Sequence, residues 1–282
     1  MAGKEAPKTI NIYSVKPESY SDTYNSGTTV QFVISGDYAL LPDSLRFSGT
    51  FNYTWTTATP RMYLDGSIGL MSLIKNITIT SSIYGVIEDI KGANVLQSII
   101  NRATVSEYDS MINSKHALSM CTSADRIYCG ARTGDPTPNR GVLSGVDEAN
   151  KIKFSILLPC AINNSNGPID IKKLGEIRIA ILLDDNRNVF YGSDYTVNAV
   201  TNGNTYTLSD LQLDFHAISG LQLPKSVALT THKIVITTLN GSSAAYIQLS
   251  DSGAATSVFG AFRNRTKFLD PNDLNSTSFT EL

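Results

Sequence analysis

Alternating apolar and polar residues run through most of this chain. In the segment from Leu45 to Trp55 the large apolar residues fall on one phase of a period of two. Such a segment is a strand with one buried face, because successive side chains of a strand point to opposite sides of the sheet. The same period recurs in Thr29–Ile34, Asn76–Thr80, Lys151–Leu157, Glu176–Leu183, Leu208–Phe215 and Lys233–Thr237. The sequence therefore predicts a mainly β protein built from antiparallel sheet.

The composition limits the kinds of partner that the chain can bind. It has 282 residues, a charged fraction of 17% and a net charge of −2. A dedicated nucleic-acid site needs clustered Lys and Arg, and the pairs Lys172–Lys173 and Arg263/Arg265 are too few. The sequence contains no run of about 18 apolar residues, the length that would predict a membrane span. The first residues lack the apolar stretch of a secretory signal, so we expect synthesis in the cytosol and a soluble product.

The three cysteines suit free thiols. Cys121, Cys129 and Cys160 are odd in number and belong to a chain for which we expect no secretion. Cys121 and Cys129 are near enough in sequence to form a local disulfide in an oxidising setting, and that alternative stays open.

One segment departs from the period of two. In Gly92–Ala103 the apolar residues follow a single helical stripe, which predicts an amphipathic helix. The following segment Ser114–Gly145 is rich in Gly, Ser, Thr and Pro and is expected to be a long surface loop. Around these lie the other predicted strands, with Tyr24–Ile34 as one long strand and Met62–Leu64 as a short one. We expect these neighbours in sequence to pair as antiparallel neighbours in the sheet.

The chain divides into three predicted parts. Residues 1–20, with Ile10 and Ile12 alternating between Pro7 and Pro17, form an N-terminal arm or edge strand. Residues 21–219 hold enough strands for one eight-stranded sandwich. Residues 220–282 carry additional C-terminal strands, which form a partial second sheet, extend the first sheet or pair with another subunit.

Signals for catalysis or metal binding are weak throughout. His116, His216 and His232 are isolated, and the cysteine spacing predicts no zinc site. The run from Asp184 to Asn188 begins like a calcium loop but lacks its glycine and terminal glutamate, so we interpret it as a hairpin turn. The adjacent carboxylate pairs are expected to be solvated charges: Glu88-Asp89, Asp147-Glu148 and Asp184-Asp185. We expect no enzyme activity, no catalytic or cofactor-binding residues and no metal.

The aromatic residues provide one candidate for a binding surface. Trp55 falls on the inward phase of its strand and is expected in the core. The tyrosines Tyr191, Tyr195 and Tyr206 lie near predicted turns and are the best candidates for an exposed aromatic patch, which a carbohydrate-binding sandwich would need.

Two stretches resemble a known family. The first runs from Gly66-Ser-Ile-Gly69 through Ile74-Lys-Asn-Ile-Thr-Ile79 and Ile83-Tyr-Gly-Val-Ile-Glu88 into the predicted helix; the second runs from Lys153-Phe-Ser-Ile to Leu183. Together they resemble the first jelly roll of the vertical jelly-roll capsid proteins of icosahedral DNA viruses, over about residues 25–220. The chain departs from that family because too few residues follow Ser219 for a second complete barrel.

The resemblance implies an antiparallel eight-stranded jelly roll with a structural role and no catalytic residues. The expected function is a virion protein, a major capsid or penton subunit, which assembles with itself as a trimer or pentamer and with other capsid proteins. Its expected location is the virion, after synthesis in the host cytoplasm. The alternative is a receptor- or carbohydrate-binding β-sandwich, for which the partner is a receptor or glycan. A hydrolase with carboxylates brought together by the fold is a third alternative.

Overall fold

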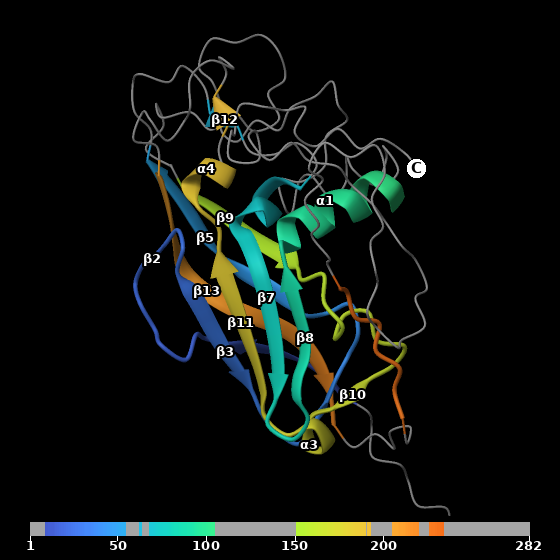
Figure 1. The fold of residues 1–282 in the computed structure, drawn as a ribbon. Coiled ribbons are helices and arrows are strands. Elements are labelled where there is room, and N and C mark those ends of the chain that lie inside the picture. The colour runs from blue at the N-terminus through green and yellow to red at the C-terminus, as the bar shows by residue number, and fades with distance from the viewer. Residues whose placement is uncertain are drawn as a thin grey trace, which may run out of the picture.

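A computed structural model describes residues 9–54, 62–63, 68–104, 151–189, 191–192, 205–219 and 226–233. In this part of the chain two antiparallel sheets pack face to face (Figure 1). The first sheet contains β1 (Ile10–Val15), β2 (Tyr24–Asn25), β4 (Ala39–Leu40), β5 (Arg46–Thr54), β9 (Lys151–Leu157), β10 (Ile169–Asp170) and β13 (Thr205–Ile218). The second contains β3 (Thr29–Ile34), β7 (Ile74–Ser81), β8 (Gly85–Lys91) and β11 (Ile177–Leu183).

Shorter elements flank the two sheets. The strands β6 (Met62–Tyr63) and β12 (Tyr191–Gly192) pair with each other in a small separate sheet. The helical elements are the 3-10 helix η1 (Gly69–Leu73) and the α-helices α1 (Ala93–Thr104), α3 (Ile171–Leu174) and α4 (Asn186–Val189). The helix α1 confirms the amphipathic helix predicted over Gly92–Ala103.

The connections between the longer strands define the fold. In the first sheet β13 pairs with both β1 and β5, and β5 pairs with β9. In the second sheet the order is β3, β11, β7, β8. Between successive members of these eight strands the chain changes sheet every time, except at the β7–β8 hairpin. This connectivity is that of an antiparallel jelly roll, as predicted.

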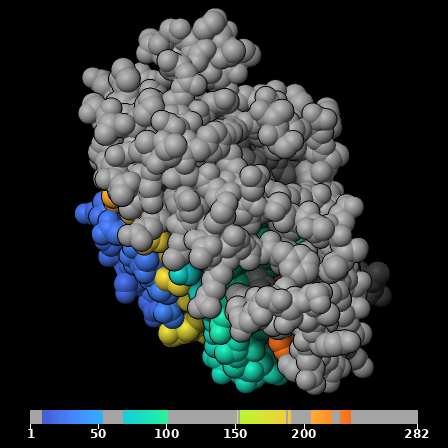
Figure 2. Space-filling view, turned by 45° about the horizontal axis from the view of Figure 1, so that its top comes forward, coloured from blue at the N-terminus to red at the C-terminus, as the bar shows by residue number. Residues whose placement is uncertain are grey.

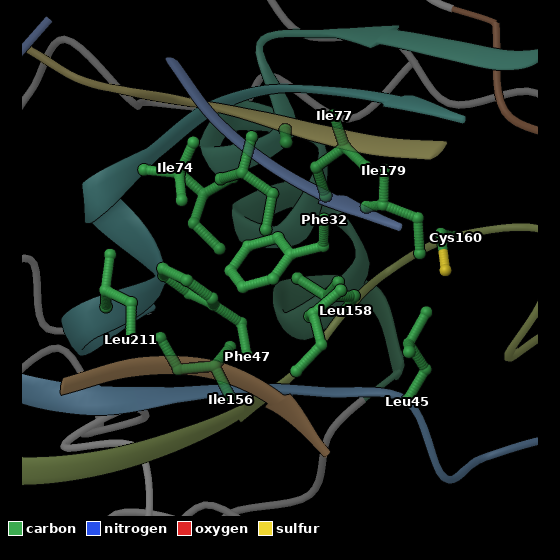
Figure 3. Packing of buried hydrophobic residues seen from close by; sticks show 14 of the residues in the cluster. Phe32, Leu45, Phe47, Ile74, Ile77, Ile156, Leu158, Cys160, Ile179 and Leu211 are labelled. Carbon is green, nitrogen blue, oxygen red and sulfur yellow. The ribbon is translucent and has the colours of Figure 1, made fainter. Parts of the chain in front are cut away.

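The core lies between the two sheets. Along β3 and β11 alternate side chains are buried, which is the pattern that one dry face requires. The rings of Phe32 on β3 and Phe47 on β5 meet edge to face at 6.1 Å, and Phe47 also contacts Phe154 on β9 at 5.4 Å. Figure 3 shows Phe32 and Phe47 pointing toward each other from opposite sheets. Aromatic and branched side chains from both sheets therefore share one apolar interior.

The prediction of one long strand over Tyr24–Ile34 was wrong. The structure divides this segment into β2, which pairs with β13, and β3, which pairs with β11 in the other sheet. The break is at Gly27, whose φ of +77° is a left-handed conformation that glycine adopts without a steric penalty. The chain uses this glycine to cross from one sheet to the other.

The prediction that each predicted strand pairs with the next predicted strand was also wrong. The strand β5 pairs with β13 and β9, and β3 pairs with β11, so most partners are far apart in the chain. Periodicity reports which face of a strand is buried but carries no information about its partner. The predicted loop over 114–145, Trp55 and the C-terminal strands after Lys233 lie outside the described residues.

Candidate functional site

Several of the residues considered as candidates for chemistry lie in the described part of the chain. His216 is exposed on β13, in the polar phase predicted for it. Cys160 is a free, fully buried thiol, and burial raises its pKa to about 12, so it stays protonated and unreactive at neutral pH. Within the described ranges no group of three or more His, Cys, Asp or Glu side chains is arranged to hold a metal ion. Cys121, Cys129 and His116 lie outside those ranges.

The prediction that Glu88 is a solvated charge was wrong. Its side chain is 1% exposed, whereas the neighbouring Asp89 is exposed. Glu88 accepts hydrogen bonds from the backbone N–H groups of Ala161 at 2.6 Å and His232 at 2.7 Å. The ring Nδ1 of His232 lies 3.2 Å from Oε1 of Glu88, the oxygen that accepts the His232 N–H. Glu88 is therefore a structural acceptor that joins three segments, because a buried carboxylate needs donors in place of water.

The prediction of a solvated charge was also wrong for Asp184, which belongs to the second carboxylate pair. It is buried, and it accepts hydrogen bonds from Asn94 Nδ2 at 2.7 Å, Asn188 Nδ2 at 2.8 Å and its neighbour's backbone N–H at 2.8 Å. Protein donors thus satisfy the oxygens that a calcium loop would offer to the ion. The segment forms the helical turn α4 rather than the predicted hairpin. The third pair, Asp147-Glu148, lies outside the described residues.

The expected exposed tyrosine patch loses one of its three members. Tyr206 is buried, and its hydroxyl donates a 2.5 Å hydrogen bond to the carbonyl of Asp184. Burial is the main cause that raises the pKa of Tyr206 far above its ordinary value. Tyr191 forms part of β12, and Tyr195 lies outside the described residues. Tyr206 was misjudged because it sits beside a turn signal, while its strand phase places it in the core.

Exposed apolar side chains gather at two places in the described part of the chain. On β1, Ile10 and Ile12 are 59% and 73% exposed. At the β7–β8 turn, Ile83, Tyr84 and Val86 are 59%, 67% and 64% exposed. We call the second group the hairpin tip. The alternation of Ile10 and Ile12 was visible in the sequence, whereas the tip was not predicted, although apolar residues beside Gly85 in a turn are a readable signal.

The hairpin tip has a defined backbone. The buried hydroxyl of Ser81 accepts hydrogen bonds from the N–H groups of Ile83 at 3.1 Å and Tyr84 at 3.0 Å. Gly85 closes the turn with a φ of +77°. The connection from α3 to β11 supports the tip from behind, since Ser82 exchanges two hydrogen bonds with Glu176, at 2.8 Å and 2.9 Å. The three apolar side chains are therefore held on a fixed support.

None of the helices in the described residues combines the length and the apolar character needed to cross a lipid bilayer.

Comparisons with known proteins found similar solved structures at low sequence identity. No protein-family model matches the chain, and no curated protein sequence matches it significantly. Among solved structures, the chain is similar to a chain of the Sputnik virophage, with 13% identity, a TM-score of 0.48 and coverage of 77% of this chain and 49% of the other. For the Faustovirus major capsid protein the identity is 8%, the TM-score 0.45 and the coverage 78% and 56%.

A third similar structure is the mavirus major capsid protein. It has 12% identity and a TM-score of 0.42, and the match covers 76% of this chain and 47% of that protein. This chain thus spans about half the length of the solved structures to which it is similar.

Proposed function

We propose that this chain is a structural virion protein, a jelly-roll subunit that assembles with copies of itself and with other capsid proteins into an icosahedral shell. The observation that carries the proposal is the connectivity of the eight long strands, with β1, β13, β5 and β9 in one sheet and β3, β11, β7 and β8 in the other. The proposal places the chain in the same class as the solved structures named above.

The fold alone leaves two classes of function open, because jelly rolls occur in viral capsids and in lectins. Two observations favour the capsid role. The stretches that resemble vertical jelly-roll capsid proteins fall on η1, β7, β8 and α1 and on β9 and β11, which are adjoining parts of the sandwich. In addition, the burial of Tyr206 removes part of the aromatic patch that a glycan-binding function was expected to use.

Assembly is the mechanism under this proposal. Contacts between subunits in a closed shell need modest individual affinity, since errors must dissociate, and the multivalency of the shell supplies the overall stability. The surface suits that task because only 17% of the residues are charged, so broad contact desolvates few ions. The predicted contact segments are residues 1–20, 114–145 and 220–282. Of these, β1 lies at one side of the first sheet and exposes Ile10 and Ile12.

The test is the state of association of the purified full chain. Light scattering coupled to size exclusion is expected to detect oligomers, and electron microscopy is expected to reveal rings or shells. Threefold or pseudo-sixfold symmetry identifies a major capsomer, and fivefold symmetry identifies a penton. A chain that stays monomeric at high concentration, with or without specific binding on a glycan array, contradicts the proposal.

A further inference from the structure

The hairpin tip is the largest exposed group of bulky apolar side chains on a single turn in the described part of the chain. Figure 2 shows, at the lower edge of the molecule, a visible surface in the teal colour of β7 and β8. An exposed turn more often carries polar residues, because apolar surface in water costs free energy. A rigid turn that exposes Ile83, Tyr84 and Val86 therefore calls for a partner that buries them.

We propose that the hairpin tip is a contact between subunits, in which Ile83, Tyr84 and Val86 pack against the same residues of a second copy of this chain. The inference rests on the proposed function and specifies one of the surfaces that assembly uses. Three properties of the tip support it: its preorganisation, its electrical neutrality and its small area.

Preorganisation lowers the cost of association. The hydrogen bonds from Ile83 and Tyr84 to Ser81, together with the pairing of Ser82 and Glu176, fix the turn before any partner arrives. Gly175 lies directly behind the turn, so close that a Cβ placed there would stand 3.0 Å from Cγ1 of Ile83. A contact made by such a turn loses little conformational entropy on binding.

The charges around the tip identify the class of partner. On the neighbouring α3, Lys172 lies 3.4 Å from Asp37, and Lys173 lies 3.6 Å from Asp170. Arg178 forms a 2.8 Å ion pair with Glu176. Since each of these cations already has a carboxylate within its own subunit, the region offers little attraction to nucleic acid or anionic lipid. With Glu18, which lies 3.8 Å from Arg178, the region holds cations and carboxylates in nearly equal number, so a second copy would meet mixed charges rather than one sign.

Symmetry and area fit a contact between identical turns. A twofold contact places the same patch on both sides, which is the commonest arrangement in homo-oligomers. Stable interfaces bury roughly 800 Å² on each partner, and three side chains can supply only part of that area. The tip is therefore a weak contact that depends on the other contacts of the shell.

The proposal is tested by disulfide trapping in the full chain. Tyr84→Cys places thiols at the tip, and Lys91→Cys places them at the opposite end of β8 as a matched exposed control. The parental protein reports any background from Cys121, Cys129 and Cys160. With an added oxidant, Tyr84→Cys is expected to give a several-fold higher yield of covalent dimer than either control.

A second pair of variants shows whether trapping depends on the apolar tip. In the Tyr84→Cys background, Ile83→Ser with Val86→Ser is expected to abolish the excess of dimer. Leu157→Ser, at an exposed apolar residue of β9 outside the predicted contact segments, is expected to preserve it. If the protein assembles by light scattering but Tyr84→Cys yields no more dimer than Lys91→Cys, the tip is not a contact and the proposed function stands. If the parental protein does not assemble at all, the proposed function itself fails, whatever the trapping result.

Discussion

The side chain of Asn163 pairs with the backbone of Leu45 as a neighbouring strand would. Its Oδ1 accepts the N–H of Leu45 at 2.9 Å, and its Nδ2 donates to the carbonyl of Leu45 at 2.9 Å. The same amide also bonds the N–H of Ser44 at 3.1 Å and the carbonyl of Leu158 at 2.8 Å. One buried side chain thus completes the hydrogen bonds at the beginning of β5 and just beyond the end of β9.

Replacing Asn163 is therefore expected to destabilise the jelly roll. Asn163→Ala leaves buried backbone donors and acceptors without partners, which costs about 3 kcal/mol of unfolding free energy. Asn164→Ala is the matched control, because Asn164 is exposed and its side chain takes no part in this network. Urea unfolding monitored by circular dichroism measures both variants. Equal midpoints for the two would contradict the assigned role.

Asp184 is expected to be a second point of structural sensitivity. Asp184→Ala removes the acceptor of Asn94, Asn188 and the backbone N–H of Asp185, so we expect a loss of about 2 to 4 kcal/mol in unfolding free energy. Asp37→Ala, at a carboxylate that is 82% exposed in a surface ion pair with Lys172, is the control and is expected to change stability by less than about 0.5 kcal/mol. Thermal and urea denaturation of the two variants provide the comparison.

Glu88 is expected to control the attachment of residues 226–233. Glu88→Ala removes the acceptor of the His232 N–H, which is expected to cost about 1.5 kcal/mol of local stability. Amide exchange in this segment is therefore expected to be roughly tenfold faster. Hydrogen exchange followed by mass spectrometry measures that segment. Asp89→Ala serves as the control. The role of Glu88 is refuted if exchange in 226–233 is the same in both variants.

Cys160 gives a prediction about pH. Burial raises its pKa to about 12, above the value that the thiol has in the unfolded chain. The unfolded state therefore loses its proton first as the pH rises, and the unfolding free energy falls between the ordinary thiol pKa and about 12. Below the ordinary pKa this contribution to stability is fully present. The pH dependence is measured by urea unfolding of the parental protein and Cys160→Ala, and it is expected to be shallower in the variant.

Gly175 and Gly167 form a matched pair for testing backbone strain. Gly175 has a φ of +73°, and a Cβ there would lie 2.3 Å from Oγ of Ser82, whereas a Cβ on Gly167 meets nothing within 4 Å. Gly175→Ala is expected to cost about 1 to 3 kcal/mol, and Gly167→Ala is expected to be tolerated. The midpoints of urea unfolding of the two variants measure this difference. Similar stabilities for both variants would show that the connection behind the hairpin tip relaxes freely.

The sequence predicted the local structure better than the pairing. The period of two located β3, β5, β9 and β11 within about one residue, because burial of one face imposes that pattern on any strand. It could not reveal that β13 pairs with β1, since that choice depends on contacts across about two hundred residues. Among the eight long strands, β8 was not predicted, because its inward phase contains Glu88, a charged residue that a pattern of apolar residues does not include.

The candidate site was harder to predict than the fold. The buried roles of Glu88 and Asp184 depend on donors brought from distant segments, and no spacing in the sequence encodes them. The exposure of Tyr84 likewise follows from the position of the β7–β8 turn at the end of the sandwich. Apolar residues in a turn could have signalled a contact surface, but only once the turn itself had been recognised.

The position of β13 in the first sheet has a consequence for the timing of synthesis. This strand, the last long one in the described part of the chain, lies between β1 and β5, so a nascent chain cannot close its first sheet until residues up to Ile218 have left the ribosome. Until then β1 and β5 each lack their shared neighbour. A product that ends before β13 therefore lacks the strand that joins β1 to β5, and its first sheet cannot form as it does in the full chain.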